Sequence, residues 1–142
     1  MKENIFIVND KKIEISRIDL DKNTLSIFDK SGKYSFHICI SYDWKGINEL
    51  KVGEEGKWMF NEYLISQYNS VDRALVWPTQ YVTKKISEDI ICFDLKFEDL
   101  TNEKNICYMN ERGSFDEPLY NMEVKVYINY KDAKDGMIVY EY

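Results

Sequence analysis

The sequence predicts an all-β protein, an antiparallel β-sandwich of about nine or ten short strands with at most one short helix. Apolar residues alternate with polar ones along most of the chain, Asn, Asp and Gly separate the alternating runs, and aromatic residues make up 15% of the composition. A period of two is typical of a strand with one buried face, and aromatic side chains favour strands. A closed β-barrel is the alternative, because it also buries one face of every strand.

The N-terminal third reads as a meander of short strands at 3–8, 12–20, 24–29 and 33–42. Turn-forming residues separate them at Asn9-Asp10-Lys11, Asp21-Lys22-Asn23 and Asp29-Lys30-Ser31-Gly32. Asn, Asp and Gly suit tight hairpins because they tolerate a positive φ or bond to nearby backbone. Three successive hairpins predict an antiparallel sheet.

The second of these strands changes parity part of the way along. Ile13 and Ile15 share one face, whereas Ile18 and Leu20 have the opposite parity. All four can be buried only if the strand contains one extra residue, so the pattern predicts a β-bulge near Ser16-Arg17.

The middle of the chain is less regular. Residues 43–57 are expected to form a long loop containing a tight turn, and 58–68 is assigned as a strand. Phe60, Leu64 and Tyr68 also match helical spacing, which leaves a helix open for that segment.

The alternation resumes after Trp77-Pro78, where proline disfavours a helix interior or a central strand. The expected strands are 81–86, 90–97, 104–109, 122–130 and 137–142, with a loop at 110–120. No linker or repeat marks a domain boundary, so residues 1–142 are expected to form a single domain.

Charge and composition restrict the class of protein. The 142 residues carry a net charge of −6 with scattered lysines, which argues against nucleic-acid binding. No apolar run approaches the ~18 residues of a membrane-spanning helix, and the N-terminus does not resemble a secretion signal. We expect a cytoplasmic protein without membrane association, and the bias toward Lys, Ile, Asn and Tyr suggests a bacterial or phage source. The three scattered cysteines, Cys39, Cys92 and Cys107, suit reduced, buried thiols.

Catalytic and cofactor motifs are sparse. The sequence contains no nucleotide-binding, serine-hydrolase or zinc-protease motif, so no cofactor and no metal are expected. His37, the only histidine, shares a strand face with Cys39, and this pair is the best candidate nucleophile. Acidic doublets occur at Glu54-Glu55, Glu98-Asp99 and Asp116-Glu117, but neighbouring residues of a strand point to opposite faces.

The candidate binding residues come from aromatic positions and from one loop. Trp44 and Trp77 lie in or beside irregular segments, and Tyr81, Tyr120 and Tyr127 fall at positions compatible with an outward orientation. Trp44, Trp77 and Tyr81 are candidate contact residues, because tyrosine and tryptophan offer large, stiff surfaces with a polar tip. The loop at 110–120 adds two anchors and two charge complements, which are Arg112, Phe115, Asp116 and Glu117.

Together these features predict a non-enzymatic binding protein. Its acidity favours a more basic protein partner, in the manner of a small immunity or inhibitor protein. One alternative is a small-molecule binder with an aromatic-lined pocket that uses Trp44, Trp58 or Trp77. A second is an enzyme that uses His37 and Cys39 or paired carboxylates. The oligomeric state is not predicted.

Overall fold

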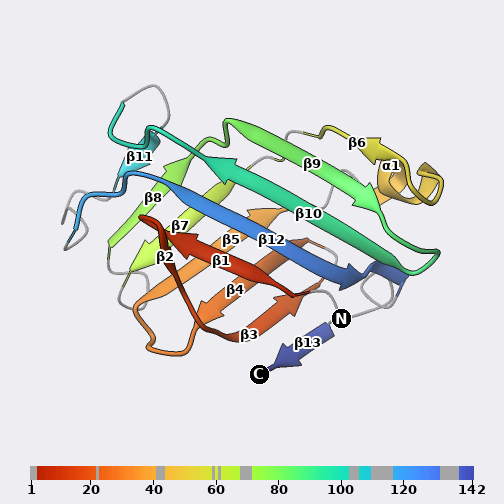
Figure 1. Cartoon of the computed structure of the whole chain (residues 1–142), viewed down its shortest axis with the longest axis horizontal. Coiled ribbons are helices and arrows are strands. Elements are labelled where there is room, and N and C mark those ends of the chain that lie inside the picture. The colour runs from red at the N-terminus through yellow and green to blue at the C-terminus, as the bar shows by residue number, and fades with distance from the viewer. Residues whose placement is uncertain are drawn as a thin grey trace.

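A computed structural model describes residues 3–21, 23–40, 44–58, 60, 62–67, 72–102, 106–109, 117–131 and 138–142. In these ranges two antiparallel sheets pack face to face with the apolar core between them (Figure 1). The fold is therefore the predicted β-sandwich and not the alternative closed barrel. No helix in the described ranges is long and apolar enough to cross a membrane.

Sheet A is the front layer in Figure 1 and has two long central strands with very short strands at both edges. Its order is β2 (Lys11–Lys12), β1 (Ile5–Val8), β12 (Met122–Asn129), β10 (Ile90–Phe97), β9 (Gln80–Lys85) and β6 (Glu55–Gly56). Two-residue edge strands offer little free backbone to another chain.

Sheet B contains only the later part of the predicted N-terminal meander. Its order is β11 (Ile106–Met109), β8 (Asp72–Val76), β7 (Tyr63–Gln67), β5 (Tyr34–Cys39), β4 (Thr24–Asp29), β3 (Ile15–Leu20) and β13 (Ile138–Glu141), and short turns join β3, β4 and β5. The meander is divided between the two sheets, because the predicted strand 3–8 pairs with β12 in sheet A and the predicted strand 12–20 is split between β2 and β3. The ladder between β3 and β4 shifts register between Ile15 and Arg17, which confirms the predicted bulge.

The core forms because alternate residues of each strand face the opposite sheet. In β12 every even-numbered residue is buried, and Val126 lies directly opposite Phe93 of β10. Aromatic rings then join the sheets: Phe97 of sheet A makes edge contacts with Phe36 and Tyr63 of sheet B at centroid distances of 5.7 and 5.8 Å.

The structure corrects two parts of the middle of the chain. The segment 43–57, expected to be a loop, contains helix α1 (Trp44–Glu49) and the short strand β6. Strand β8 was not expected, because Asp72–Val76 places Ala74, Leu75 and Val76 in one apolar run without alternation. The assignment of 58–68 as a strand is confirmed for Tyr63–Gln67.

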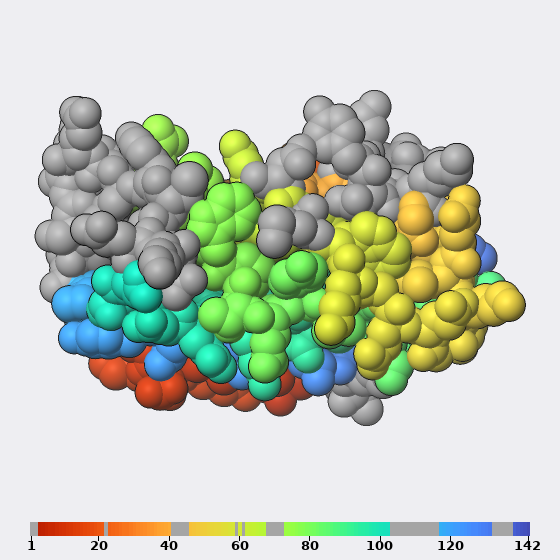
Figure 2. Space-filling view, turned by 90° about the horizontal axis from the view of Figure 1, so that it is seen from above, coloured from red at the N-terminus to blue at the C-terminus, as the bar shows by residue number. Residues whose placement is uncertain are grey.

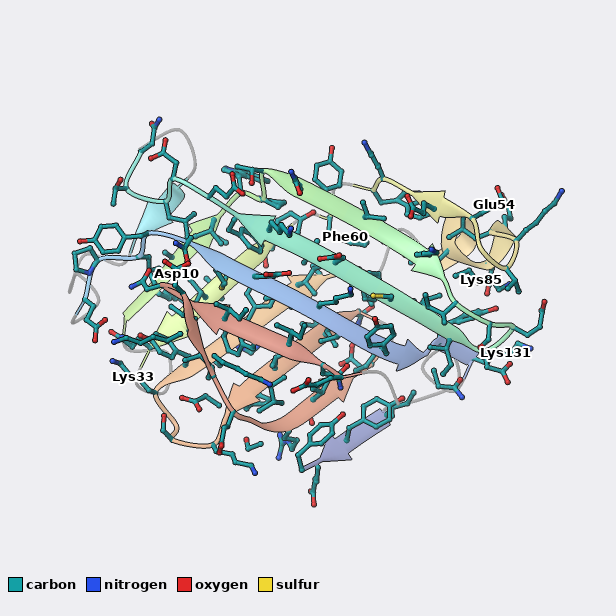
Figure 3. The ribbon with its side chains drawn as sticks, in the orientation of Figure 1. Asp10, Lys33, Glu54, Phe60, Lys85 and Lys131 are labelled. Atoms are coloured by element: carbon teal, nitrogen blue, oxygen red, sulfur yellow. The ribbon has the colours of Figure 1, made fainter. Side chains whose placement is uncertain are left out.

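The sandwich has two different ends. Helix α1 and β6 lie together at one end, where Figure 2 shows them in gold and yellow. Asp10 in the β1–β2 turn and Lys33 beside the β4–β5 turn lie at the opposite end, as the labels in Figure 3 show. Both clefts described below are at this second end.

Candidate functional site

A groove lies at the end of sheet A where β10 finishes and β12 begins. It has a volume of about 480 Å³. Its lining residues come from β1 and the β1–β2 turn, from the end of β10 and the segment after it, and from the segment before β12 and the start of β12. They are Ile7, Asp10, Lys96, Phe97, Glu98, Asp99, Tyr120, Asn121, Met122 and Glu123. Tyr120 is 54% exposed, one of the most exposed large apolar side chains in the described residues. We call this feature the acidic groove.

Tight turns place the acidic side chains at the rim of the groove. Asn9 and Asp10 both have a positive φ, of 52° and 65°, as expected for a two-residue hairpin turn between β1 and β2. Asp99 also has a positive φ, of 51°, where the chain turns after β10. Asn and Asp tolerate this region better than other residues that carry a side chain.

Hydrogen bonds fix the walls of the groove to one another. The side-chain oxygen of Asn9 accepts a bond from the Tyr120 backbone N–H at 2.7 Å, and its amide nitrogen donates to the carbonyl of Pro118 at 2.8 Å. The Asp10 backbone N–H donates to Asn121 Oδ1 at 3.0 Å. On the other wall the Leu100 N–H donates to the Tyr120 carbonyl at 2.9 Å. Tyr120 is thus held between two turns that are far apart in the sequence.

The groove is strongly negative. Four carboxylate side chains line it against one lysine, Lys96. Lys96 lies directly opposite Glu123 in the β10–β12 ladder, so its charge offsets that carboxylate first. Asp10, Glu98 and Asp99 place three further carboxylates around the exposed ring of Tyr120, and Asp99 also accepts a hydrogen bond from the Asn102 side chain at 3.3 Å. Such a groove attracts cationic groups and offers an aromatic face to them.

The predicted aromatic contact residues lie elsewhere. Trp77 is half-buried and makes an edge contact with Tyr63 at 6.2 Å. Tyr81 lies opposite Leu95 on the inward side of sheet A and packs against the core, so it does not occupy the outward position expected from the sequence. Trp44 begins α1, at the end of the molecule away from the groove. The structure does not bring these three residues together in either described cleft.

Three of the four predicted loop residues, Arg112, Phe115 and Asp116, lie outside the described residues. The fourth, Glu117, is exposed and forms an ion pair with Lys33 at 3.5 Å. It belongs to a second cleft beside the acidic groove. Sequence reasoning missed Tyr120 as the centre of a site. It placed Tyr120 among the tyrosines compatible with an outward orientation and noted the acidic doublet Glu98-Asp99, but it did not connect the two.

His37 and Cys39 share the outer face of sheet B, as predicted, but His37 binds serine hydroxyls. Its Nδ1 lies 2.8 Å from Ser26 Oγ and its Nε2 lies 3.3 Å from Ser35 Oγ. The imidazole also makes an edge contact with Phe28 at 5.9 Å. Because both ring nitrogens face hydroxyl groups, the geometry does not direct a base toward the Cys39 thiol. Cys39 and Cys92 are not in disulfide bonds.

Burial lowers the pKa of His37, because the charged imidazolium loses hydration in this half-buried site. The unfolded chain takes up a proton as the pH falls through about 6.5, and the folded chain does so only at lower pH. The unfolded state then binds more protons, so acidification through this window lowers stability. We expect the wild type to lose more stability than His37→Gln between pH 7.5 and 5.5, measured by urea unfolding. Equal losses in the two proteins would contradict this assignment.

Among the described residues, no group of three or more His, Cys, Asp and Glu side chains is arranged to hold a metal ion. Comparison with known proteins gives no match to protein-family models, to curated protein sequences or to solved structures.

Proposed function

We propose that this protein is a non-enzymatic binding protein that holds a basic segment of a protein partner in the acidic groove. The observation that carries this proposal is the exposed ring of Tyr120, whose backbone is fixed between two hydrogen-bonded turns and which lies among Asp10, Glu98 and Asp99. A rigid aromatic anchor within a charged rim is typical of protein contact surfaces.

The long-range charge of the molecule supports the same partner. The net charge of −6 attracts a basic protein from a distance, and the groove places excess carboxylates where that protein docks. Because the turns around Tyr120 are already fixed by hydrogen bonds, little conformational entropy is lost when a partner binds. These properties suit an acidic protein of immunity or inhibitor type that occupies the basic site of its partner.

A fluorescently labelled hexa-arginine peptide tests the proposal. We expect it to bind the wild type with an affinity that falls as salt is added, because the contacts are between exposed charges. The double variant Glu98→Gln, Asp99→Asn should weaken binding about tenfold, in line with the loss of two charge-assisted contacts of modest strength. Asparagine preserves the tolerance of position 99 for a positive φ. Fluorescence anisotropy measures the dissociation constants.

The matched control removes the same amount of charge at the other end of the sandwich. Glu54→Gln, Glu55→Gln changes two exposed acids at the start of β6, at the other end of the sandwich, where Figure 3 labels Glu54. This variant should leave peptide affinity within about twofold of the wild type, because salt screens exposed charges that are far from the binding site. Equal weakening by both double variants would mean that the peptide responds only to net charge, and the groove would then not be the binding site. The addition of Tyr120→Ala separates the aromatic contribution from the charge.

A further inference from the structure

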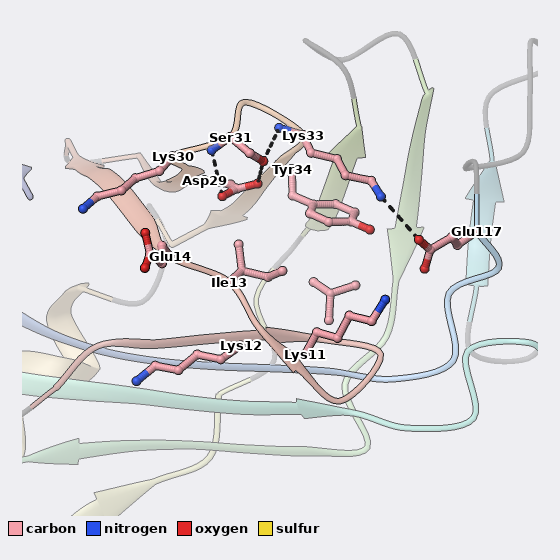
Figure 4. Close-up of a pocket in the computed structure, with 11 residues that line it drawn as sticks. Lys11, Lys12, Ile13, Glu14, Asp29, Lys30, Ser31, Lys33, Tyr34 and Glu117 are labelled. Atoms are coloured by element: carbon pink, nitrogen blue, oxygen red, sulfur yellow. Dashed lines mark hydrogen bonds and ion pairs between the residues drawn. The ribbon is translucent and has the colours of Figure 1, made fainter.

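A second cleft opens between the two sheets, at the same end as the acidic groove. It has a volume of about 280 Å³. One side comes from the β1–β2 hairpin of sheet A and the other from the β4–β5 turn of sheet B (Figure 4). Four lysines line it, in a protein that is acidic overall: Lys11, Lys12, Lys30 and Lys33. We call it the lysine cleft.

The floor of the lysine cleft is apolar. Val8 is 2% exposed and Tyr34 is 7% exposed, and the partly buried Ile13 packs against the same core. An apolar floor with a cationic rim matches a ligand that has an apolar body and an anionic group. The volume is close to the lower limit of about 300 Å³ for pockets that bind small molecules, so the ligand must be small.

Three acids line the lysine cleft, Glu14, Asp29 and Glu117, and local contacts hold two of them. Asp29 is buried and accepts hydrogen bonds from the backbone N–H of Ser31, at 3.1 Å, and from the Ser31 hydroxyl. Glu117 is paired with Lys33 at 3.5 Å. The ion pair with Lys33 offsets the charge of Glu117, and the hydrogen bonds at Asp29 hold its carboxylate against the β4–β5 turn.

Two contacts hold the ammonium group of Lys33 in the cleft. Its ammonium group lies 5.2 Å from the centre of the Tyr34 ring, a distance at which ring and cation attract each other, and it faces Glu117 on the opposite side of the cleft. In Figure 4 the side chains of Lys11 and Lys33 extend toward the same end of the cleft as Glu117. Glu117 thus occupies the position that a ligand anion would take between these ammonium groups.

We infer that the lysine cleft binds a small organic anion, whose apolar body covers Val8, Ile13 and Tyr34. Its carboxylate, sulfonate or phosphate group displaces Glu117 from Lys33. Glu117 is half-exposed and its side chain turns into water at little cost, so it acts as an internal competitor. This inference is independent of the acidic groove, which lies on the other side of the β1–β2 hairpin.

The fluorescent probe 8-anilinonaphthalene-1-sulfonate tests the inference, because it combines an apolar body with one anionic group. We expect Lys33→Gln to raise its dissociation constant about fivefold, the effect of losing one charge-assisted contact. Glu117→Gln should lower the constant about threefold, because it removes the competitor. Lys33→Arg keeps the positive charge and should retain most of the wild-type affinity for the probe. General damage to the fold would not raise the dissociation constant in Lys33→Gln and lower it in Glu117→Gln.

The pair of Lys84 and Glu55, at 3.9 Å on sheet A, provides matched controls. Lys84→Gln and Glu55→Gln should leave the affinity within about twofold, since they alter net charge equally but lie outside the cleft. The uncharged analogue N-phenyl-1-naphthylamine should respond to neither Lys33→Gln nor Glu117→Gln. The inference is overturned if the sulfonate probe does not bind the wild type, if Lys33→Gln leaves its affinity unchanged, if Glu117→Gln weakens it, or if Lys84→Gln weakens it as much as Lys33→Gln.

Discussion

Phe36→Ala is expected to lower the free energy of unfolding by about 3–5 kcal/mol, the usual range for removing a buried phenylalanine. Phe36 is fully buried in β5, between Ile27 of β4 and Ile65 of β7. Its ring also contacts Phe97 of sheet A, so the truncation removes a contact between the sheets as well as apolar burial. The surrounding β-strands are paired on both sides, which limits their collapse into the cavity. Urea unfolding followed by circular dichroism measures the change.

Phe28→Ala is the matched comparison. Phe28 lies in the neighbouring strand β4, is opposite Ser35, and faces outward with Arg17 over its ring at 5.0 Å. Being half-buried, it loses less apolar burial on truncation, and no cavity forms inside the core. If Phe28→Ala lowered the free energy of unfolding as much as Phe36→Ala, Phe28 would contribute as much to stability as a core residue. The register, which places Phe36 on the inner face of sheet B and Phe28 on the outer face, would then be wrong.

Alternation predicts strands well wherever one face of a strand meets the core and the other meets solvent. The segments 24–29 and 90–97 agree with β4 and β10 at both ends for this reason. The bulge at Ile15 and Arg17 is predicted for a similar reason, because a change of parity has few other structural solutions. Strand β8 and helix α1 are missed because a five-residue strand without alternation and a six-residue helix give too short a pattern.

The acidic groove could not be predicted because it depends on strand order. Asp10, Asp99 and Tyr120 lie far apart in the sequence and meet only because β1 and β10 both pair with β12. Alternation indicates which way a side chain points but not which strands are neighbours. The lysine cleft is hidden for the same reason, since Lys11 and Lys33 belong to different sheets. The outward position of Tyr120 and the turn at Asp10 were the parts of the site that the sequence could indicate.

Gly56→Ala is expected to lower the free energy of unfolding by about 1–3 kcal/mol, as overpacking usually does. A Cβ atom at Gly56 would lie 2.1 Å from a ring carbon of Trp58, so the indole or the strand must move. The strand is held in place: Gly56 pairs with Thr83 in β9, and the nearby Lys85 donates from its backbone N–H to the Glu54 carbonyl at 3.1 Å. The indole therefore shifts, and we expect a changed chemical shift for the Trp58 indole N–H together with a lower urea midpoint.

Gly46→Ala tests whether the Trp58 indole can move to make room for a new Cβ atom. Gly46 lies in α1 on another side of the same ring, and its added Cβ would be 3.0 Å from the Trp58 indole nitrogen, a distance that a small shift relieves. Alanine also favours the helix by about 1 kcal/mol over glycine, so the two effects nearly cancel and stability should change little. If Gly46→Ala were instead as destabilising as Gly56→Ala, the indole would have to be fixed from both sides. The Trp58 ring would then be packed tightly between α1 and β6, and replacing either glycine would force α1 and β6 apart.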